Sequence, residues 1–499
     1  MSTTLLAAVL IAFVALMFGI ALRARNRIAT LEDYLVAGRR LSLPLATATL
    51  FATWFGAGTL MTATDEVRAE GLRAAALEPI GPGLCLVIAG LFFASRLWGM
   101  KLMTLPDFYR RRFGARAEIV SSLIMIPGYF GWIAAQFVAL AGILNVFWQV
   151  PMHHGIWLVA AVGAGYTLLG GMWSVALTDA AQVVLLLAGL VVLAGTVLVE
   201  LAGPGAAEGL SAGFARFVAA VPAEDLVLMP TETAAALVGW LSVLAIGALG
   251  NIPGQDLAQR VFAARSARVA AAACVIAGVL YIVFGMVPVA TGLAADALGV
   301  GDGQATLAVL ASALMSPAMS IVFVLALVSA VMSTLDSAIL APSSVLSNNL
   351  LAKLKPRASS IALARWAIVA IASCSIAFAY IGQSAYELLE TAYAVGMVGL
   401  FVPLAVGLGS ARGNEGAALA AMLAGIGLWA FHLTLGWDTF GGPLLGALWL
   451  PQELAATAGA WLAYEAVAAA ARNTRREAGD IGDYRRAGSQ ATRAEPLAE

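Results

Sequence analysis

Long apolar runs of about 20 residues recur along the chain and restrict its fold more than any other feature. A helix of this length reaches about 30 Å, which is the thickness of the hydrocarbon core of a bilayer. Lipid offers no hydrogen bonds to backbone N–H and C=O groups, so each run must be helical. Charged residues make up only 11% of the 499 residues, against roughly 25% in soluble domains. We therefore predict an all-α integral membrane protein.

Thirteen such runs, spans 1 to 13, can be placed before residue 470. Their approximate ranges are 3–22, 42–64, 76–95, 118–148, 155–173, 179–200, 233–254, 268–292, 317–345, 360–382, 386–410, 416–436 and 444–470. No basic segment precedes the first run and three arginines follow it, which favours a retained span over a cleaved signal peptide.

Basic residues gather in the loops on one side of these spans. If the N-terminus is outside, only Arg68, Arg73 and Arg216 of the 28 basic residues fall on the outer side. Arg260 is counted here in the inner loop after span 7. The positive-inside rule then predicts an outer N-terminus and a cytoplasmic C-terminus. We expect the location to be the plasma (inner) membrane.

Two spans contain helix-breaking residues near their middle. Span 2 holds Gly56 and Gly58, and span 7 holds Gly250, Asn251 and Pro253. Glycine frees the backbone and proline removes a hydrogen-bond donor, so both helices can unwind. Five spans separate them, as a five-plus-five inverted repeat requires when one broken helix opens each half. The alternative is that these small residues only allow close helix packing.

Four segments between spans 1 and 11 resemble the sodium:solute symporter family. They are residues 33–41 (DYLVAGRRL), 170–182 (GGMWSVALTDAAQ), 255–264 (QDLAQRVFAA) and 329–346, which begins SAVMSTLDSA. The resemblance implies the leucine-transporter fold, in which spans 2 to 11 form a ten-helix core with one helix before it and two after it.

This fold sets the expected domain boundaries. They are 1–41 for the extra helix and inner loop, 42–411 for the transport core with repeats at about 42–200 and 233–411, 412–470 for the two C-terminal helices, and 471–499 for a disordered cytoplasmic tail.

Within the family, residues 52–58 (ATWFGAG) look closest to the high-affinity choline transporter branch. In that branch a tryptophan follows the proline of the second broken helix and helps to enclose the quaternary ammonium. Gly254 follows Pro253 here, and Gln136 resembles pantothenate-type members instead. Choline is therefore not carried over as the solute.

Ser333 and Thr334 are adjacent hydroxyl residues inside an apolar helix. Each hydroxyl could simply bond a carbonyl one turn back. Alternatively, the pair can bind a hard cation together with carbonyl groups of an unwound helix. The resemblance implies a sodium site formed by the carbonyls of Ala52, Phe55 and Ala330 and the two hydroxyls.

Asp179 and Asp336 lie within predicted spans 6 and 9, where a carboxylate is costly and needs a reason. For Asp179 the alternative is a helix N-cap together with Thr178. Relatives with two coupled sodium ions imply a second cation site formed by Asp179, Ser333, Asp336 and Ser337. Positions 333, 336 and 337 share one helix face.

Five further residues are candidate solute contacts. Trp54 sits in the first broken helix and could offer its ring face to the solute or to a cation. The other candidates are Gln136, Asn251, Trp132 and Tyr393. All five could equally be ordinary core residues of a helix bundle.

Together these features predict a secondary active transporter that couples sodium to a small organic solute by alternating access. The solute could be an amino acid, a carboxylate, a vitamin or a quaternary amine, and the surrounding partner is the lipid bilayer. The net charge of −1 gives no indication of nucleic acid. There is no Walker motif for ATP and no nucleophile–base pair for an enzyme.

No cofactor is expected, and no metal beyond sodium, because the three cysteines and three histidines lack metal-site spacing. Two alternatives stay open. One is a proton-coupled symporter in which Asp179 or Asp336 carries the proton. The other is a transporter-like sensor, against which the absence of a kinase-sized domain after span 13 argues.

Overall fold

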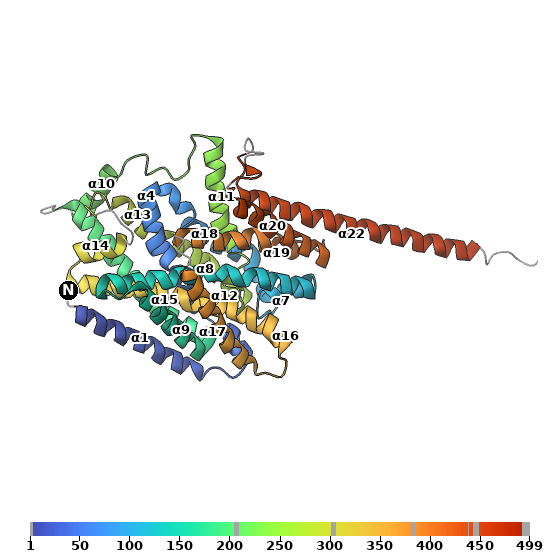
Figure 1. The fold of residues 1–499 in the computed structure, drawn as a ribbon, viewed down its shortest axis with the longest axis horizontal. Coiled ribbons are helices and arrows are strands. Elements are labelled where there is room, and N and C mark those ends of the chain that lie inside the picture. Colours follow the sequence, from blue (N-terminus) through green and yellow to red (C-terminus); the bar gives the residue numbers. More distant parts are fainter. Residues whose placement is uncertain are drawn as a thin grey trace, which may run out of the picture.

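The computed structural model describes residues 3–203, 209–300, 306–380, 385–437, 439–442 and 449–491, with the backbone alone at 385–387 and 473–491. These residues form an all-α bundle in which no β-strand occurs, apart from two isolated backbone bridges (Figure 1). The predicted fold class is confirmed.

The first half of the chain supplies spans 1 to 6, with short 3-10 or π segments labelled η. Its elements are α1 (Thr3–Arg25), α2 (Leu31–Val36), η1 (Ala37–Arg39), α3 (Leu43–Trp54), η2 (Gly58–Thr62), α4 (Ala63–Glu70), η3 (Leu72–Ala76), α5 (Ile80–Ile88), η4 (Ala89–Phe93), α6 (Ala94–Gly99), α7 (Pro106–Arg112), α8 (Ala115–Trp148), α9 (Met152–Ala202) and α10 (Leu210–Ala220).

The second half supplies spans 7 to 13. Its elements are α11 (Ala234–Gly250), α12 (Gln255–Ala263), α13 (Ala267–Ala294), α14 (Thr306–Leu314), α15 (Pro317–Val345), η5 (Leu346–Leu351), α16 (Ala352–Leu354), α17 (Ser360–Ala379), α18 (Ala385–Gly396), η6 (Met397–Phe401), α19 (Val402–Gly409), α20 (Glu415–Leu435) and α22 (Gln452–Ala491).

Among the described residues, 10 helices are long and apolar enough to cross a membrane, and two bent pairs raise the number to 12. One of the ten is α9, whose 51 residues would reach about 75 Å if straight, more than twice a hydrocarbon core. Its backbone is not helical at Gly171, which divides it into the two segments predicted as spans 5 and 6. Counting both segments would give 13 spans, a number that stays a prediction.

The turn inside α9 requires glycine. Gly171 has φ 49° and ψ −145°, a conformation that side chains rarely allow. A Cβ atom at this position would also overlap the carbonyl oxygen of Tyr34 in α2. The short helix α2 therefore packs directly against the turn that joins the two segments.

The two broken helices occur at the predicted positions. α3 and the η2–α4 segment meet at an angle of 57°, and α11 meets α12 at 41°. The breaks coincide with Gly56 in the first pair and with Pro253 and Gly254 in the second. The prediction of one broken helix at the start of each half is confirmed.

The assignment of Arg260 to an inner loop was wrong. Residues 255–263 form α12, and all nine of its residues are buried. The apolar run ends at residue 254 because α12 carries polar side chains, but these side chains find partners inside the protein instead of reaching water.

α15 forms the centre of the bundle, where it packs against α9, α8, α17, α3 and α12. Every residue from 326 to 345 is buried, including the hydroxyl and carboxyl groups of this stretch. Buried polar groups must find partners within the protein or in a bound ligand. This helix therefore carries the polar centre of the molecule.

At the C-terminus, α20 and α22 pack against each other, as expected for two helices after the core. α22 continues as helical backbone to Ala491 and extends away from the bundle (Figure 1). The disorder expected for residues 471–499 stays a prediction, and residues 492–499 lie outside the described part of the chain.

We expect Gly171→Ala to destabilise the protein by about 1–3 kcal/mol, because alanine cannot adopt this conformation without strain. Thermal unfolding of the purified protein in detergent measures the effect. Gly195→Ala is the matched control, since it lies on the same helix with nothing within 4 Å of its added Cβ. Equal unfolding temperatures for Gly171→Ala and the wild type would show that the turn does not need glycine.

Candidate ion and solute sites

The break in α3 brings backbone groups directly against α15. α3 ends at Trp54 with Phe55 as its C-cap, and a Cβ atom at the following Gly56 would overlap the side chain of Thr334. The freed N–H of Ala57 donates to Gln136 Oε1 at 3.0 Å. Glycine thus permits the close approach, while the amide of Gln136 satisfies a donor that the missing helical turn leaves open.

Four of the five predicted sodium ligands converge at this break. Ser333 Oγ lies 3.0 Å from the Ala52 carbonyl oxygen and 2.8 Å from that of Ala330. Thr334 Oγ1 lies 3.3 and 3.2 Å from the same two oxygens. The fifth predicted ligand, Phe55, is the C-cap of α3. Neutral oxygens around one point suit a hard monovalent cation.

The two predicted carboxylates are fully buried nearby. Asp179 Oδ2 accepts a hydrogen bond from Thr49 Oγ1 at 2.5 Å, and Asp336 Oδ1 accepts one from Ser337 Oγ at 3.1 Å. Asp179 Oδ1 and Asp336 Oδ2 accept none from the described residues. Buried polar atoms in proteins are usually hydrogen-bonded, so these two oxygens need a partner that the described residues do not supply.

Asp179 is not a helix cap. It lies well inside α9, beyond the turn at Gly171, and the helix continues on both sides of it. The hydroxyl of Thr178 donates back to the carbonyls of Ser174 and Val175 at 2.9 and 3.0 Å. The capping alternative is therefore wrong, and the cost of burying this carboxylate needs another explanation.

Arg260 is the residue of this region that the sequence reasoning missed. Its guanidinium is fully buried, with Nη1 donating to the Asp256 carbonyl at 3.0 Å and Nη2 donating to Ser337 Oγ. Ser337 Oγ in turn donates to Asp336 Oδ1 at 3.1 Å, so one hydroxyl links the guanidinium to that carboxyl group. One guanidinium can balance at most one of the two carboxyl groups, so the other requires a proton or a cation.

A small cavity of about 40 Å³ lies between α8, the break of α11–α12, and the α18–η6 segment. Three predicted solute contacts, Trp132, Asn251 and Tyr393, line it. Tyr129 and Asp256 line it as well, and neither was assigned a role from the sequence. The cavity therefore combines aromatic rings with an amide and a carboxylate.

The other two predicted contacts lie beside this cavity instead of in its lining. The indole N–H of Trp54 donates to the carboxylate of Asp256, which also accepts from Tyr129 Oη at 2.5 Å. The amide of Gln136 is engaged by the broken backbone of α3. Trp54 thus joins the first broken helix to the second through Asp256.

Glu78 is a second buried acid that the sequence reasoning missed, and it is only 2% exposed. Its Oε1 accepts from Tyr393 Oη at 2.9 Å, and its Oε2 accepts from Tyr281 Oη at 2.9 Å and Thr59 Oγ1 at 3.0 Å. Tyr281 Oη also lies 2.9 Å from the Trp54 carbonyl. Glu78 lies inside a predicted span, and this position could have identified it as a candidate site residue, as it did for Asp179 and Asp336.

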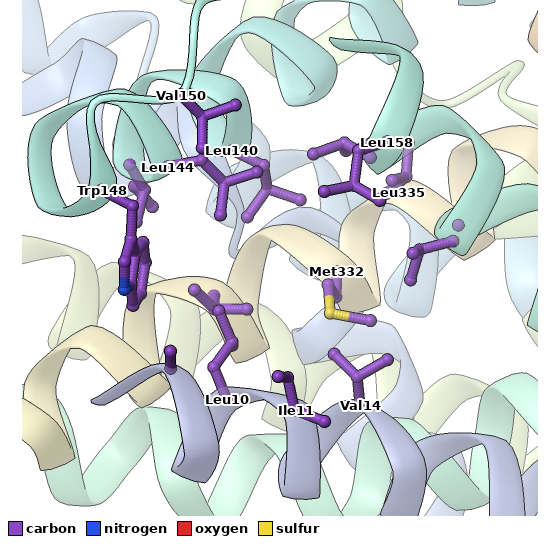
Figure 2. Close-up of a pocket in the computed structure, with 16 residues that line it drawn as sticks. Leu10, Ile11, Val14, Leu140, Leu144, Trp148, Val150, Leu158, Met332 and Leu335 are labelled. Atoms are coloured by element: carbon purple, nitrogen blue, oxygen red, sulfur yellow. The ribbon is translucent and has the colours of Figure 1, made fainter. Parts of the chain in front are cut away.

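A larger hollow of about 330 Å³ lies between α1, α8, α9 and α15 (Figure 2). Its wall contains aliphatic side chains such as Leu10, Val14, Leu140 and Leu335 and carries no charged residue. It fits an apolar chain rather than a polar solute, and we do not assign it to transport.

Two helices are broken inside this bundle, and hydroxyl and carbonyl oxygens gather at the first break. The model of the sodium:solute symporter family matches residues 34–425. The chain belongs to the sodium:solute symporter family, a family of transporters and not of enzymes.

Curated relatives agree with this assignment. The high affinity choline transporter 1 of Homo sapiens is 29% identical over 336 residues, which are 64% of this chain and 56% of the relative. The sodium/myo-inositol cotransporter 2 of Rattus norvegicus is 30% identical over 169 residues, 33% of this chain and 25% of the relative. The chain thus spans little more than half the length of the choline transporters that it matches.

Solved structures show the same fold. A sodium-coupled sialic acid symporter, in a substrate-bound outward-open state, aligns with a TM-score of 0.74 at 19% identity over 92% of this chain and 96% of its own. A nucleobase-cation-symport-1 family transporter aligns with a TM-score of 0.53 at 15% identity over 88% of this chain and 95% of its own. At these identities the likeness extends to the fold alone.

We expect Arg260→Met to destabilise the protein by about 3–5 kcal/mol, because it leaves two buried carboxylates without their counter-charge. The double variant Arg260→Met/Asp336→Asn should recover part of that loss, since one negative charge is removed as well. Thermal unfolding of both variants tests this coupling.

Arg265→Met, which removes an exposed guanidinium from the next turn of the chain, is the control and should unfold like the wild type. If the double variant is less stable than Arg260→Met alone, the guanidinium does not balance these carboxylates.

Proposed function

We propose that this chain is a sodium-coupled symporter that moves a small organic solute across the plasma membrane by alternating access. The convergence of the Ser333 and Thr334 hydroxyls on the Ala52 carbonyl carries the proposal. Membership of the sodium:solute symporter family supports sodium as the coupling ion.

Sodium would join two parts of the bundle at this point. The hydroxyls belong to α15 and the Ala52 carbonyl belongs to α3, so an ion between them holds the first broken helix against the central helix. A ligand shifts a conformational equilibrium only by its differential affinity for the two states. Bound sodium would thus favour the arrangement in which the cavity beside α3 accepts solute. Loss of sodium would release α3 from α15.

A second coupling ion would bind among Asp179, Ser333, Asp336 and Ser337. The orphaned oxygens of the two aspartates and the single nearby guanidinium support this assignment. Each sodium ion entering down a membrane potential supplies about 2.3 kcal/mol per 100 mV. One alternative is a proton-coupled symporter, in which Asp179 or Asp336 carries the proton. The other alternative is a transporter-like sensor.

The solute would occupy the cavity lined by Trp132, Asn251 and Tyr393, with Trp54 closing it from the first broken helix. The solute classes consistent with such a cavity are amino acids, carboxylates, vitamins and quaternary amines. The resemblance to the choline transporter branch implies a tryptophan after the proline of the second broken helix, whereas Gly254 follows Pro253 here. The N-terminus would lie outside and the C-terminus in the cytoplasm.

Replacing Ser333 and Thr334 together by alanine should weaken sodium binding about tenfold, or about 1.4 kcal/mol, because two ligand oxygens are lost. Equilibrium binding of radiolabelled sodium to the purified protein measures the change. Ser343→Ala is the control, since this buried hydroxyl of α15 only donates to the Ile339 carbonyl one turn back. Unchanged sodium affinity in the double variant would remove both residues from the ion site.

Asp336→Asn should lower the Hill coefficient of sodium binding from above 1 to about 1, because one of two coupled sites would be lost. The same radiolabel titration gives this number. A coefficient that is equal in the variant and the wild type would contradict a second sodium site at Asp336.

A further inference from the structure

We propose that the solute carries a protonated amine with at least one N–H group, which donates to Asp256 beside a second buried acid, Glu78. This inference rests on the proposed function, because it concerns the solute of the same transporter. It narrows the solute from several chemical classes to one.

Asp256 supplies the recognition group. It is 4% exposed and lines the cavity at the start of α12, directly after the break in the second broken helix. A carboxylate offers about four acceptor positions. The hydroxyl of Tyr129 donates to Oδ1 of Asp256 and the indole N–H of Trp54 donates to Oδ2. Each oxygen therefore keeps one acceptor position for a donor from a ligand.

Glu78 is a second buried acid behind the cavity wall. It accepts a hydrogen bond from the hydroxyl of Tyr393, and Tyr393 itself lines the cavity. Its three described hydrogen-bond partners, Tyr393, Tyr281 and Thr59, are neutral hydroxyl groups, so none of them supplies a positive charge.

Neither acid has an ion-pair partner among the described residues. Arg260 donates to the backbone carbonyl of Asp256 and to Ser337 Oγ. The buried acid Glu118 differs, because Lys353 lies 2.6 Å from it. A buried acid without an ion-pair partner disfavours an anionic solute and favours one that brings a positive charge.

The walls of the cavity favour an N–H donor over a quaternary ammonium. A quaternary ammonium has no proton to donate and depends on aromatic faces around it. Gly254 offers no side chain at the second break, whereas the carboxylate of Asp256 follows two residues later. A protonated amine can donate to this carboxylate while the rings of Tyr129 and Trp132 contact its carbon atoms.

The test uses matched triplets of small compounds at saturating sodium. Each triplet contains a tertiary amine, its trimethylammonium analogue and its neutral tert-butyl analogue; dimethylethanolamine, choline and 3,3-dimethyl-1-butanol form one of them. Thermal stabilisation of the purified wild-type protein gives an apparent affinity for each compound. We expect at least one amine to bind tenfold or more tightly than both of its analogues.

Asp256→Asn should remove this preference, and Glu118→Gln, which changes a buried acid away from the cavity, should retain it. Stabilisation by sodium without any solute shows that each variant is folded, and it reports on the ion site separately. If Asp256→Asn does not fold, the relative affinities of the wild-type protein for the amine and its two analogues test the proposal on their own.

An absence of amine binding, or equal or tighter binding of a quaternary or neutral analogue, would overturn the proposal. Loss of the sodium response in the wild type would instead contradict the proposed function. The two failures are therefore distinguishable.

Discussion

A helix that stops inside a membrane leaves backbone N–H and C=O groups that lipid cannot satisfy. In α3 this constraint is met on both sides of the break. Gln136 of α8 accepts from the freed N–H of Ala57, and the hydroxyls of Ser333 and Thr334 lie on the Ala52 carbonyl. The arrangement of α8 and α15 around α3 depends on these contacts, and Gly56 permits the close approach that they need.

Charge is the second constraint on this interior. The buried ionisable groups of the described core are the acids Glu78, Asp179, Asp256 and Asp336 and one base, Arg260, apart from Glu118 with its lysine partner. Uncompensated charge is expensive in a low-dielectric interior. One base cannot balance four acids, so the remaining acids must hold a proton or face a cation, and in the proposed function that cation is sodium.

Much of the fold could be predicted from the sequence because lipid leaves the backbone few options. The apolar runs place the helices, and Gly56 and Pro253 mark the two breaks. α12 was not predictable in this way, because its polar residues are buried only through partners far along the chain. Gln255 contacts the Leu105 N–H, for example, and Gln259 donates to the Leu35 carbonyl.

The residues of the candidate sites also fall into two groups, those predicted from local motifs and those whose role depends on neighbours far along the chain. Resemblance of local motifs placed the hydroxyls on α15 and the carbonyl of α3, and the structure brings four of those five predicted ligands together. Glu78, Asp256 and Arg260 gain their importance from neighbours on other helices. Sequence spacing does not show that Tyr393 faces Glu78 or that Trp54 donates to Asp256.

The central claim is that this interior binds sodium specifically to balance its charge and to tie α3 to α15. The most direct test is the unfolding temperature of the wild-type protein, without solute, as potassium is replaced by sodium at constant ionic strength. Binding to the folded state alone raises stability by RT ln(1 + [L]/Kd). The account predicts an unfolding temperature that rises with sodium concentration and is low in potassium alone. An unfolding temperature that is the same in both salts would contradict it.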